Sequence, residues 1–107
     1  MTVKEFSQKE GFELVTGDGA REIEGVYCGD LLSIVMGRAP ADSGWVTVMG
    51  NTNSVAVALL TDVACIVLAE GMELEEQAAE KAQQQNISII KTQKPVFEAA
   101  RLMWESL

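Results

Sequence analysis

The sequence contains no histidine and only two cysteines among its 107 residues. The absence of histidine removes the commonest general base and every Ser-His or Cys-His nucleophile. Cys28 and Cys65 stand apart from each other and from other soft ligands, which argues against a zinc or iron–sulfur site. Both lie in apolar runs, so we expect two reduced, buried thiols, with a disulfide or a redox switch as the alternatives. We expect no metal and no cofactor.

Basic residues are scarce as well. Eight lysines and arginines face 16 acidic residues, which gives a formal net charge of −8. Such a surface repels a phosphate backbone and an anionic membrane, so we expect neither nucleic acid nor membrane as a partner. No apolar run reaches the roughly 18 residues of a membrane span, and the N-terminus lacks the basic and apolar segments of a signal peptide. We therefore expect a cytoplasmic protein.

Phosphate-binding and catalytic motifs are also missing. The chain has no G-x-x-x-x-G-K-[ST] loop and no G-x-G-x-x-G fingerprint, since Gly17 and Gly19 lack the third glycine and a following helix. Asp30 and Glu70 could form a carboxylate pair, but a helix cap and a solvated turn residue explain them more simply. We therefore expect that the chain is not an enzyme.

What the sequence does contain is a regular alternation of apolar strands and helical segments. From residue 45 onward the order is strand–helix–strand–helix–strand–helix, which implies parallel strands joined by right-handed crossovers. This pattern predicts a single α/β domain over residues 1–107, in three layers, with a mostly parallel sheet of about five strands and helices on both faces. We expect strands at residues 12–16, 22–28, 45–49, 64–68 and 87–90, and helices at residues 3–9, 31–36, 54–61, 73–85 and from Pro95 onward.

Two helical segments carry surfaces of opposite character. The segment 73–85 is rich in acidic residues near its positive end and has a thin inner stripe, which is typical of a solvated helix, with a surface for a basic partner as the alternative. In the last helix, Phe97 and Trp104 widen an already broad apolar face. That breadth is more typical of a core or a dimer surface than of a ligand pocket. The face comprises Val96, Ala99, Ala100, Met103 and Leu107.

Small polar residues gather in the turns that follow the predicted strands. Because the carboxyl ends of parallel strands lie at one edge of a sheet, we expect these turns to converge there and frame a small polar ligand such as a nucleotide. Helix N-terminal N–H groups after Gly50 could hold a phosphate. The alternative is that glycine only makes the turns and the polar residues only cap helices. The candidate ligand-binding residues are Gly29, Asp30, Gly50, Asn51, Thr52, Asn53, Glu70, Gly71 and Thr92.

The segments 25–32, 45–51 and 63–71 together resemble the DRTGG domain, most closely its short stand-alone bacterial versions. The similarity covers nearly the whole chain. In length and layout the chain is also similar to the N-terminal domain of HPr kinase/phosphorylase, without the catalytic domain of that enzyme. Two parts of the family's namesake pattern differ: its Asp-Arg pair corresponds here to Asn51-Thr52, and its Thr-Gly-Gly corresponds to residues 69–71, where only Gly71 is kept.

The resemblance implies a non-catalytic regulatory domain that acts as a homodimer. DRTGG domains occur beside CBS domain pairs, which bind adenine nucleotides, so the resemblance also implies a small ligand of that kind. The alternative is a pure protein–protein interaction or assembly module for a partner enzyme, without a small-molecule ligand.

Overall fold

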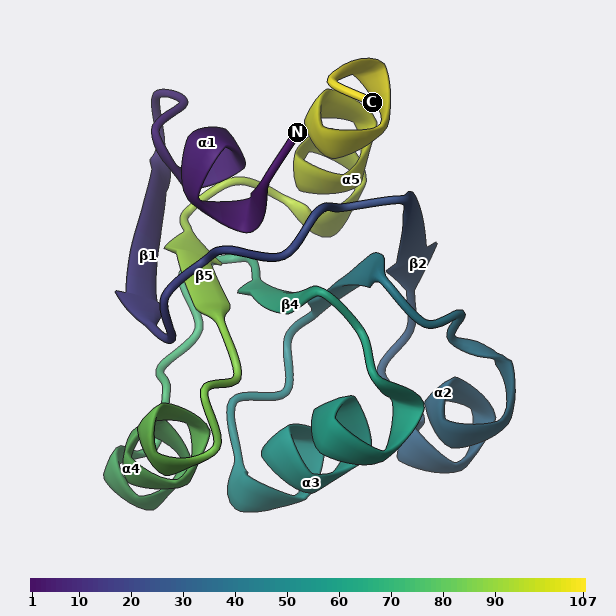
Figure 1. Cartoon of the computed structure of the whole chain (residues 1–107), viewed down its shortest axis with the longest axis vertical. Helices are drawn as coiled ribbons and strands as arrows, with labels where there is room; N and C mark the ends of the chain where they lie inside the picture. Colours follow the sequence, from purple (N-terminus) through teal and green to yellow (C-terminus); the bar gives the residue numbers. More distant parts are fainter.

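A five-stranded sheet in the order β1-β5-β4-β3-β2 forms the centre of the molecule (Figure 1). The computed structural model describes all residues, 1–107. Four strands are parallel, and β1 alone runs antiparallel, beside β5. The mostly parallel sheet of the sequence prediction is therefore confirmed. The strands are β1 (Phe12–Thr16), β2 (Gly25–Cys28), β3 (Ser43–Thr47), β4 (Cys65–Leu68) and β5 (Ile89–Thr92).

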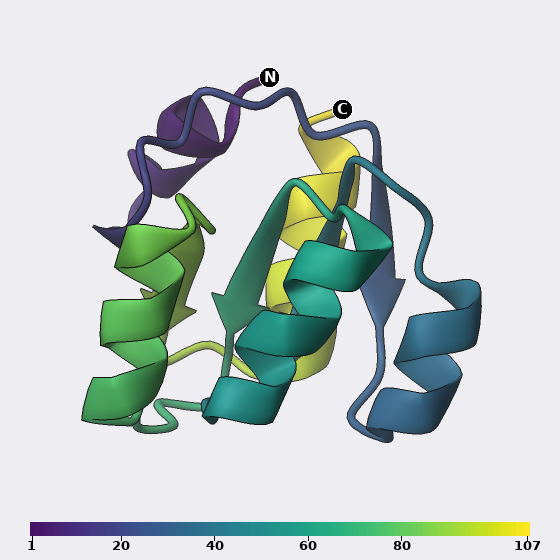
Figure 2. The ribbon, with the colours of Figure 1, turned by 60° about the horizontal axis from the view of Figure 1, so that its bottom comes forward.

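Helices cover both faces of the sheet, which confirms the predicted three layers. Each of β3, β4 and β5 is added on the same side of the strand before it, so the right-handed crossovers place three helices on one face. Figure 2 shows these helices side by side in front of the sheet, with α5 behind it. The crossover helices are α2 (Leu32–Arg38), α3 (Thr52–Thr61) and α4 (Glu76–Gln84); α1 (Val3–Ser7) and α5 (Val96–Glu105) cover the other face. No helix is long and apolar enough to span a lipid bilayer.

The winding of the sheet bears directly on where a ligand can bind. From β2 to β5 the strand order advances in one direction without a reversal. Doubly wound α/β folds bind ligands in the crevice that forms where the strand order reverses. The parallel part of this sheet has no such reversal, so its carboxyl edge is a row of neighbouring turns rather than a split between two half-sheets.

The central strands are buried on both faces, which explains why their sequences are apolar without alternation. Trp45 and Ile66 point toward the layer of α2, α3 and α4, while Val46 and Val67 point toward α1 and α5. All four side chains are at most 2% exposed. The two resulting cores anchor β3 and β4 from opposite sides and hold the strand ends in place.

Several element boundaries differ from the prediction. Strands β3 and β5 both lie about two residues away from their predicted positions, β3 earlier and β5 later. Gly44, expected in a loop, lies inside β3 because Met103 of α5 packs against its backbone and leaves no room for a Cβ. Gly37, expected to stop a helix, lies within α2, whose C-cap is Ala39. Thr2 and Glu5 form a capping box at the start of α1.

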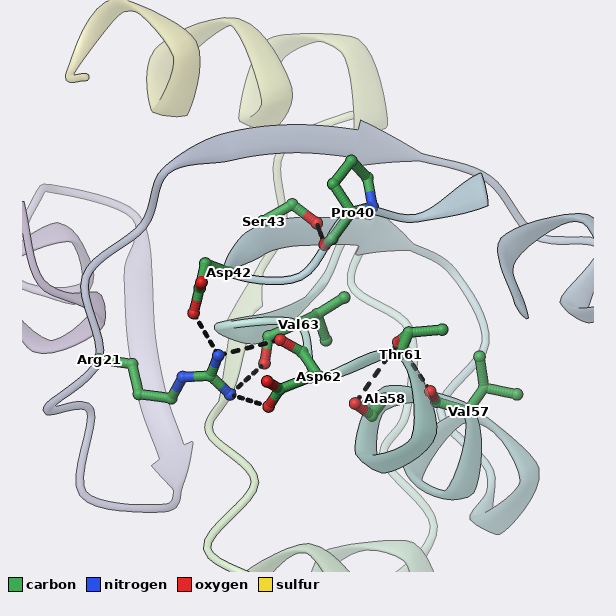
Figure 3. A network of polar contacts seen from close by, with 9 residues as sticks. All are labelled: Arg21, Pro40, Asp42, Ser43, Val57, Ala58, Thr61, Asp62 and Val63. Atoms are coloured by element: carbon green, nitrogen blue, oxygen red, sulfur yellow. Dashed lines mark hydrogen bonds and ion pairs between the residues drawn. The ribbon is translucent and has the colours of Figure 1, made fainter. Parts of the chain in front are cut away.

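The prediction that a strand starts at residue 22 is wrong, since β2 starts only at Gly25. The segment between β1 and β2 instead crosses the amino ends of the parallel strands. Arg21 holds this crossing by binding two loops at once (Figure 3). Its guanidinium bonds Asp42 before β3, and it donates to Asp62 Oδ1 (2.9 Å), the Asp62 carbonyl (2.9 Å) and the Val63 carbonyl (3.0 Å) before β4. Arg21 is therefore a structural residue at the edge opposite the candidate ligand site.

Candidate functional site

The turns that the sequence places at one edge of the sheet do lie along that edge, because β2, β3, β4 and β5 are parallel. They follow the strand order as neighbours, each bonded to the turn or strand beside it. The question for function is whether their polar groups face a shared space or are already engaged by the fold.

Asp30, expected as the N-cap of α2, has another role. The N-cap position is Leu31, without a side-chain bond. Asp30 Oδ1 instead accepts from Thr47 Oγ1 (2.7 Å) and from the Val48 N–H (3.0 Å). Beside it, the carbonyl of Gly29 accepts from Trp45 Nε1 at 2.8 Å. This turn therefore ties the carboxyl end of β2 to that of β3.

The turn from Gly50 is covered by the segment that precedes α4. Asn51 caps α3, its side-chain oxygen accepting from the Ser54 N–H at 3.0 Å. The Glu75 N–H donates to the Gly50 carbonyl at 2.9 Å. A Cβ on Gly50 would lie 2.3 Å from the Glu73 carbonyl, and the apolar gap below the turn is too small for a water molecule. The predicted helix at residue 73 starts only at Glu76 because this covering segment comes first.

Thr52 and Asn53 open the first turn of α3, and neither lines a pocket of the structure. Thr52 is half-buried and Asn53 is exposed, and neither side chain makes a hydrogen bond within the chain. These two residues therefore lie beside the covered turn without facing the polar pocket of the sheet edge.

The third turn joins β4 to β5 and α5. Glu70 and Gly71 both have left-handed backbones, with φ of 62° and 68°. Glu70 Oε2 accepts from the Val96 N–H at 2.9 Å and so satisfies a free donor at the start of α5. The Gly71 N–H donates to the Thr92 carbonyl at 3.0 Å. Thr92 Oγ1 donates in turn to the Gly11 carbonyl at 2.7 Å.

A polar pocket of about 270 Å³ opens at the end of β5, next to β1. Gly71 and Thr92 are the two predicted site residues that line it. Lys91 and Gln93, on either side of Thr92, also line it. The remaining wall comes from the start of β1, because β1 runs antiparallel and brings Gly11 to the carboxyl edge of β5. No local pattern predicts this wall, because the sequence does not indicate which strand β1 joins. The lining residues are Gly11, Phe12, Glu13, Gly71, Lys91, Thr92 and Gln93.

The pocket and the turns offer hydrogen bonds and a lysine on the pocket wall, Lys91, but no arranged nucleophile. Asp30 and Glu70 are bonded to different elements, β3 and α5, and no hydrogen bond joins them. No group of three acidic or thiol side chains is placed to hold a metal ion. The pocket wall therefore presents a lysine, a carboxylate and an amide side chain to the space at this edge.

A second surface stands out at the opposite margin of the sheet, where β2 has no further strand beside it. An apolar groove of about 350 Å³ runs between β2 and α5. Phe97 and Trp104, predicted to widen an apolar face typical of a core or a dimer surface, are 76% and 66% exposed along this groove, while Ala99 and Met103 are buried. We call this surface the β2 face. The groove is lined by Val26, Cys28, Phe97, Ala100, Arg101 and Trp104.

The two cysteines lie in different environments, and the expectation that both are buried is wrong for one of them. Cys65 is fully buried in β4, and burial raises the pKa of its thiol to about 12. Cys28 is exposed on the β2 face because β2 is an edge strand. Partial burial of its sulfur and the nearby charge of Asp30 raise the pKa of the Cys28 thiol. Both are free thiols.

Comparison with known proteins places the chain in a family. The family model of the DRTGG domain matches residues 14–106. No curated protein sequence matches. The fold is similar, with a TM-score of 0.70 and 16% identity, to the crystal structure of the CBS and DRTGG domains of the regulatory region of Clostridium perfringens pyrophosphatase, complexed with the activator diadenosine tetraphosphate. The match covers 99% of this chain and 50% of that structure, so this chain spans about half the length of the pyrophosphatase regulatory region.

Proposed function

The chain belongs to the DRTGG domain family, and from this premise we propose that it is a non-catalytic regulatory domain that acts as a homodimer and senses a small ligand such as an adenine nucleotide. The fold match over 99% of the chain to half of a nucleotide-activated regulatory region carries this proposal. The engagement of Asp30 and Glu70 with different elements, β3 and α5, also fits a regulatory role.

Within this proposal the polar pocket beside β5 is the place for the ligand. It is the open, polar space at the carboxyl edge, whereas the turn at Gly50 is covered. Lys91 supplies a positive charge for a phosphate group, and the Gln93 side chain, which packs against Gly71, supplies amide hydrogen-bonding groups. With Glu13 also on the wall, the pocket suits a ligand that carries both an anionic group and hydrogen-bond donors.

Calorimetric titration and thermal-shift measurement with AMP, ADP, ATP and diadenosine tetraphosphate test the ligand. We expect binding that Lys91→Ala weakens about tenfold, the scale of one charge-assisted hydrogen bond. Lys81→Ala, which removes an exposed lysine of α4 outside the pocket, serves as the control and leaves binding unchanged. No response at millimolar nucleotide removes the sensing role.

The second candidate function is a pure interaction or assembly module for a partner enzyme, without a small-molecule ligand. One observation favours this candidate: the polar side chains of the turns already make hydrogen bonds within the chain. These side chains are Asp30, Asn51, Glu70 and Thr92. The nucleotide titration separates the two candidates, because this one requires that no nucleotide binds while the chain still assembles.

A further inference from the structure

We propose that the β2 face is the surface on which a second copy of this chain binds, so that the two copies meet edge to edge at β2 with their α5 helices packed across a two-fold axis. This inference rests on the homodimer of the proposed function and assigns it a surface. Four features of the face support a second copy as the occupant.

The first feature is the unprotected edge of β2. An edge strand presents a row of unpaired N–H and C=O groups, and proteins discourage unwanted pairing there with charged residues or proline. β2 contains Gly25, Val26, Tyr27 and Cys28, and none of them is charged. The other edge strand, β1, carries Glu13 as its second residue and so has a charge that β2 lacks. An antiparallel pairing of two identical edges is self-complementary, as a two-fold interface requires.

The second feature is the exposed apolar area on both sides of this edge. Aromatic side chains bury roughly 150–250 Å² each, so Phe97 and Trp104 at their observed exposure present about 250–300 Å² per copy. That is about a third of the roughly 800 Å² that each partner contributes to a stable interface. Across the sheet, α2 and its N-cap add Leu31, Ile34 and Met36, which are 62%, 47% and 42% exposed.

The third feature is the arrangement of side chains along α5. Phe97 and Trp104 are seven residues apart and therefore lie on one side of the helix, with Ala100 and Arg101 one turn between them. The small side chain of Ala100 leaves the groove between the two aromatic rings. The same helix of a second copy, running in the opposite direction, offers an aromatic ring to each end of this groove.

The fourth feature is charge. A copy that carries a net charge of −8 is repelled by an identical copy over most of its surface. The acidic residues of α4 and the segment before it lie beside β5 and β1, at the margin of the sheet opposite β2 (Figure 1). Arg101 is the one charged residue that lines the groove of the β2 face, and it pairs with Glu105 at 2.9 Å. The β2 face is thus where two copies approach with the least repulsion.

Sedimentation equilibrium of the full chain tests this inference. We expect a mass of twice 11.6 kDa at micromolar concentration. Phe97→Glu and Trp104→Glu each place two like charges in the interface, and we expect each to raise the dimer dissociation constant about a hundredfold or more, as hot-spot substitutions do. Both side chains are exposed in the monomer, so unfolding is not expected, and circular dichroism of each variant checks this.

Leu60→Glu is the matched control. Leu60 is 71% exposed, as much as the two aromatic residues, but it lies on α3, on the face of the sheet opposite α5. We expect Leu60→Glu to leave the dimer intact. If the dimer survives both α5 substitutions, or if Leu60→Glu alone disrupts it, the assignment of the interface to the β2 face is wrong, while the homodimer of the proposed function stands. A wild-type chain that stays monomeric at all concentrations overturns both, and the nucleotide titration then decides the sensing role separately.

Discussion

At the scale of single residues, the side chains that decide this structure are those that bind backbone far away in sequence. Arg21 is one of them, because its donors reach the carbonyls of Asp62 and Val63 and the carboxylates of Asp42 and Asp62. Both aspartates have left-handed backbones, with φ of 65° and 60°, which Asp adopts more readily than most residues. The cluster therefore fixes two tight loops that the sequence alone presented as unrelated charges.

Replacing Arg21 by Met should lower the free energy of unfolding at pH 7 by about 1–2 kcal/mol. Most of this loss comes from the two bonds to backbone carbonyls, at roughly 1 kcal/mol each, because the ion pairs are more than a third exposed and solvent screens them. Urea denaturation measures the change. Arg38→Met, at an exposed arginine that makes no ion pair, is the control and should change stability by less than about 0.5 kcal/mol.

The difference between wild type and Arg21→Met should also depend on pH. The hydrogen bond and charge of Arg21 hold the pKa of Asp42 below its usual range. A carboxyl with a lowered folded-state pKa stabilises the fold above its unfolded-state pKa, about 4, and loses that contribution as the pH falls through the folded-state pKa. The stability difference should therefore be constant from pH 8 to 5 and shrink below about pH 4. A difference that grows on acidification contradicts this assignment.

At the scale of elements, the sequence predicted the type and order of the helices and strands, and the errors have physical causes. Apolar periodicity locates β4 well because every residue of the strand is buried. It misplaces β3, because glycine is typical of turns, whereas Gly44 lies within the strand and Met103 packs against its backbone. It misplaces the start of α4, since the covering segment before it has no local signature of its own. In each case a contact with a distant element overrides the local pattern.

The contact of β3 with α5 gives a sharp test at this scale. A Cβ on Gly44 would lie 2.2 Å from Met103 Sδ, so Gly44→Ala should cost about 1–3 kcal/mol through overpacking. Gly25→Ala makes the same change in β2, where nothing lies within 4 Å of the new Cβ, and should be close to neutral.

Met103→Val removes the atoms that the new methyl group meets, so the double variant Gly44→Ala/Met103→Val should be more stable than the sum of the single effects. Urea denaturation of the four proteins gives the coupling free energy. Additive losses would mean that Gly44 matters for a reason other than this contact.

At the scale of the whole molecule, the sequence predicted the layers and the parallel edge, but not how the surfaces are divided. The shared edge follows from the order of strands and helices, which local pattern reveals. The polar pocket depends on β1 joining β5 in the antiparallel sense, and the β2 face depends on β2 being the last strand. The pocket and the β2 face therefore depend on the order of strands in the sheet, which the hydrophobic periodicity of the sequence does not encode. The result is a molecule with a polar pocket at one margin and an apolar face at the other.

Cys28 reports on the β2 face without any substitution. In the native chain a thiol reagent should modify one cysteine, Cys28, because Cys65 is buried and its pKa is raised to about 12; both should react after unfolding. Since the pKa of Cys28 is also raised, its reaction should accelerate as the pH increases above 8. Because Cys28 lines the groove, its reaction rate should fall several-fold between nanomolar and high micromolar chain concentration, as dimers form.

In Phe97→Glu the rate of Cys28 should stay the same across that concentration range, since the groove is then no longer covered by a second copy. The Cys28→Ser variant confirms which thiol is measured, because the native reaction should disappear in it. If wild-type Cys28 reacts equally fast at concentrations where sedimentation finds a dimer, the two copies meet elsewhere and the groove beside Trp104 stays open. Protection of Cys28 that Phe97→Glu removes would instead connect the exposed aromatic pair, the bare edge of β2 and the self-association of the chain in one measurement.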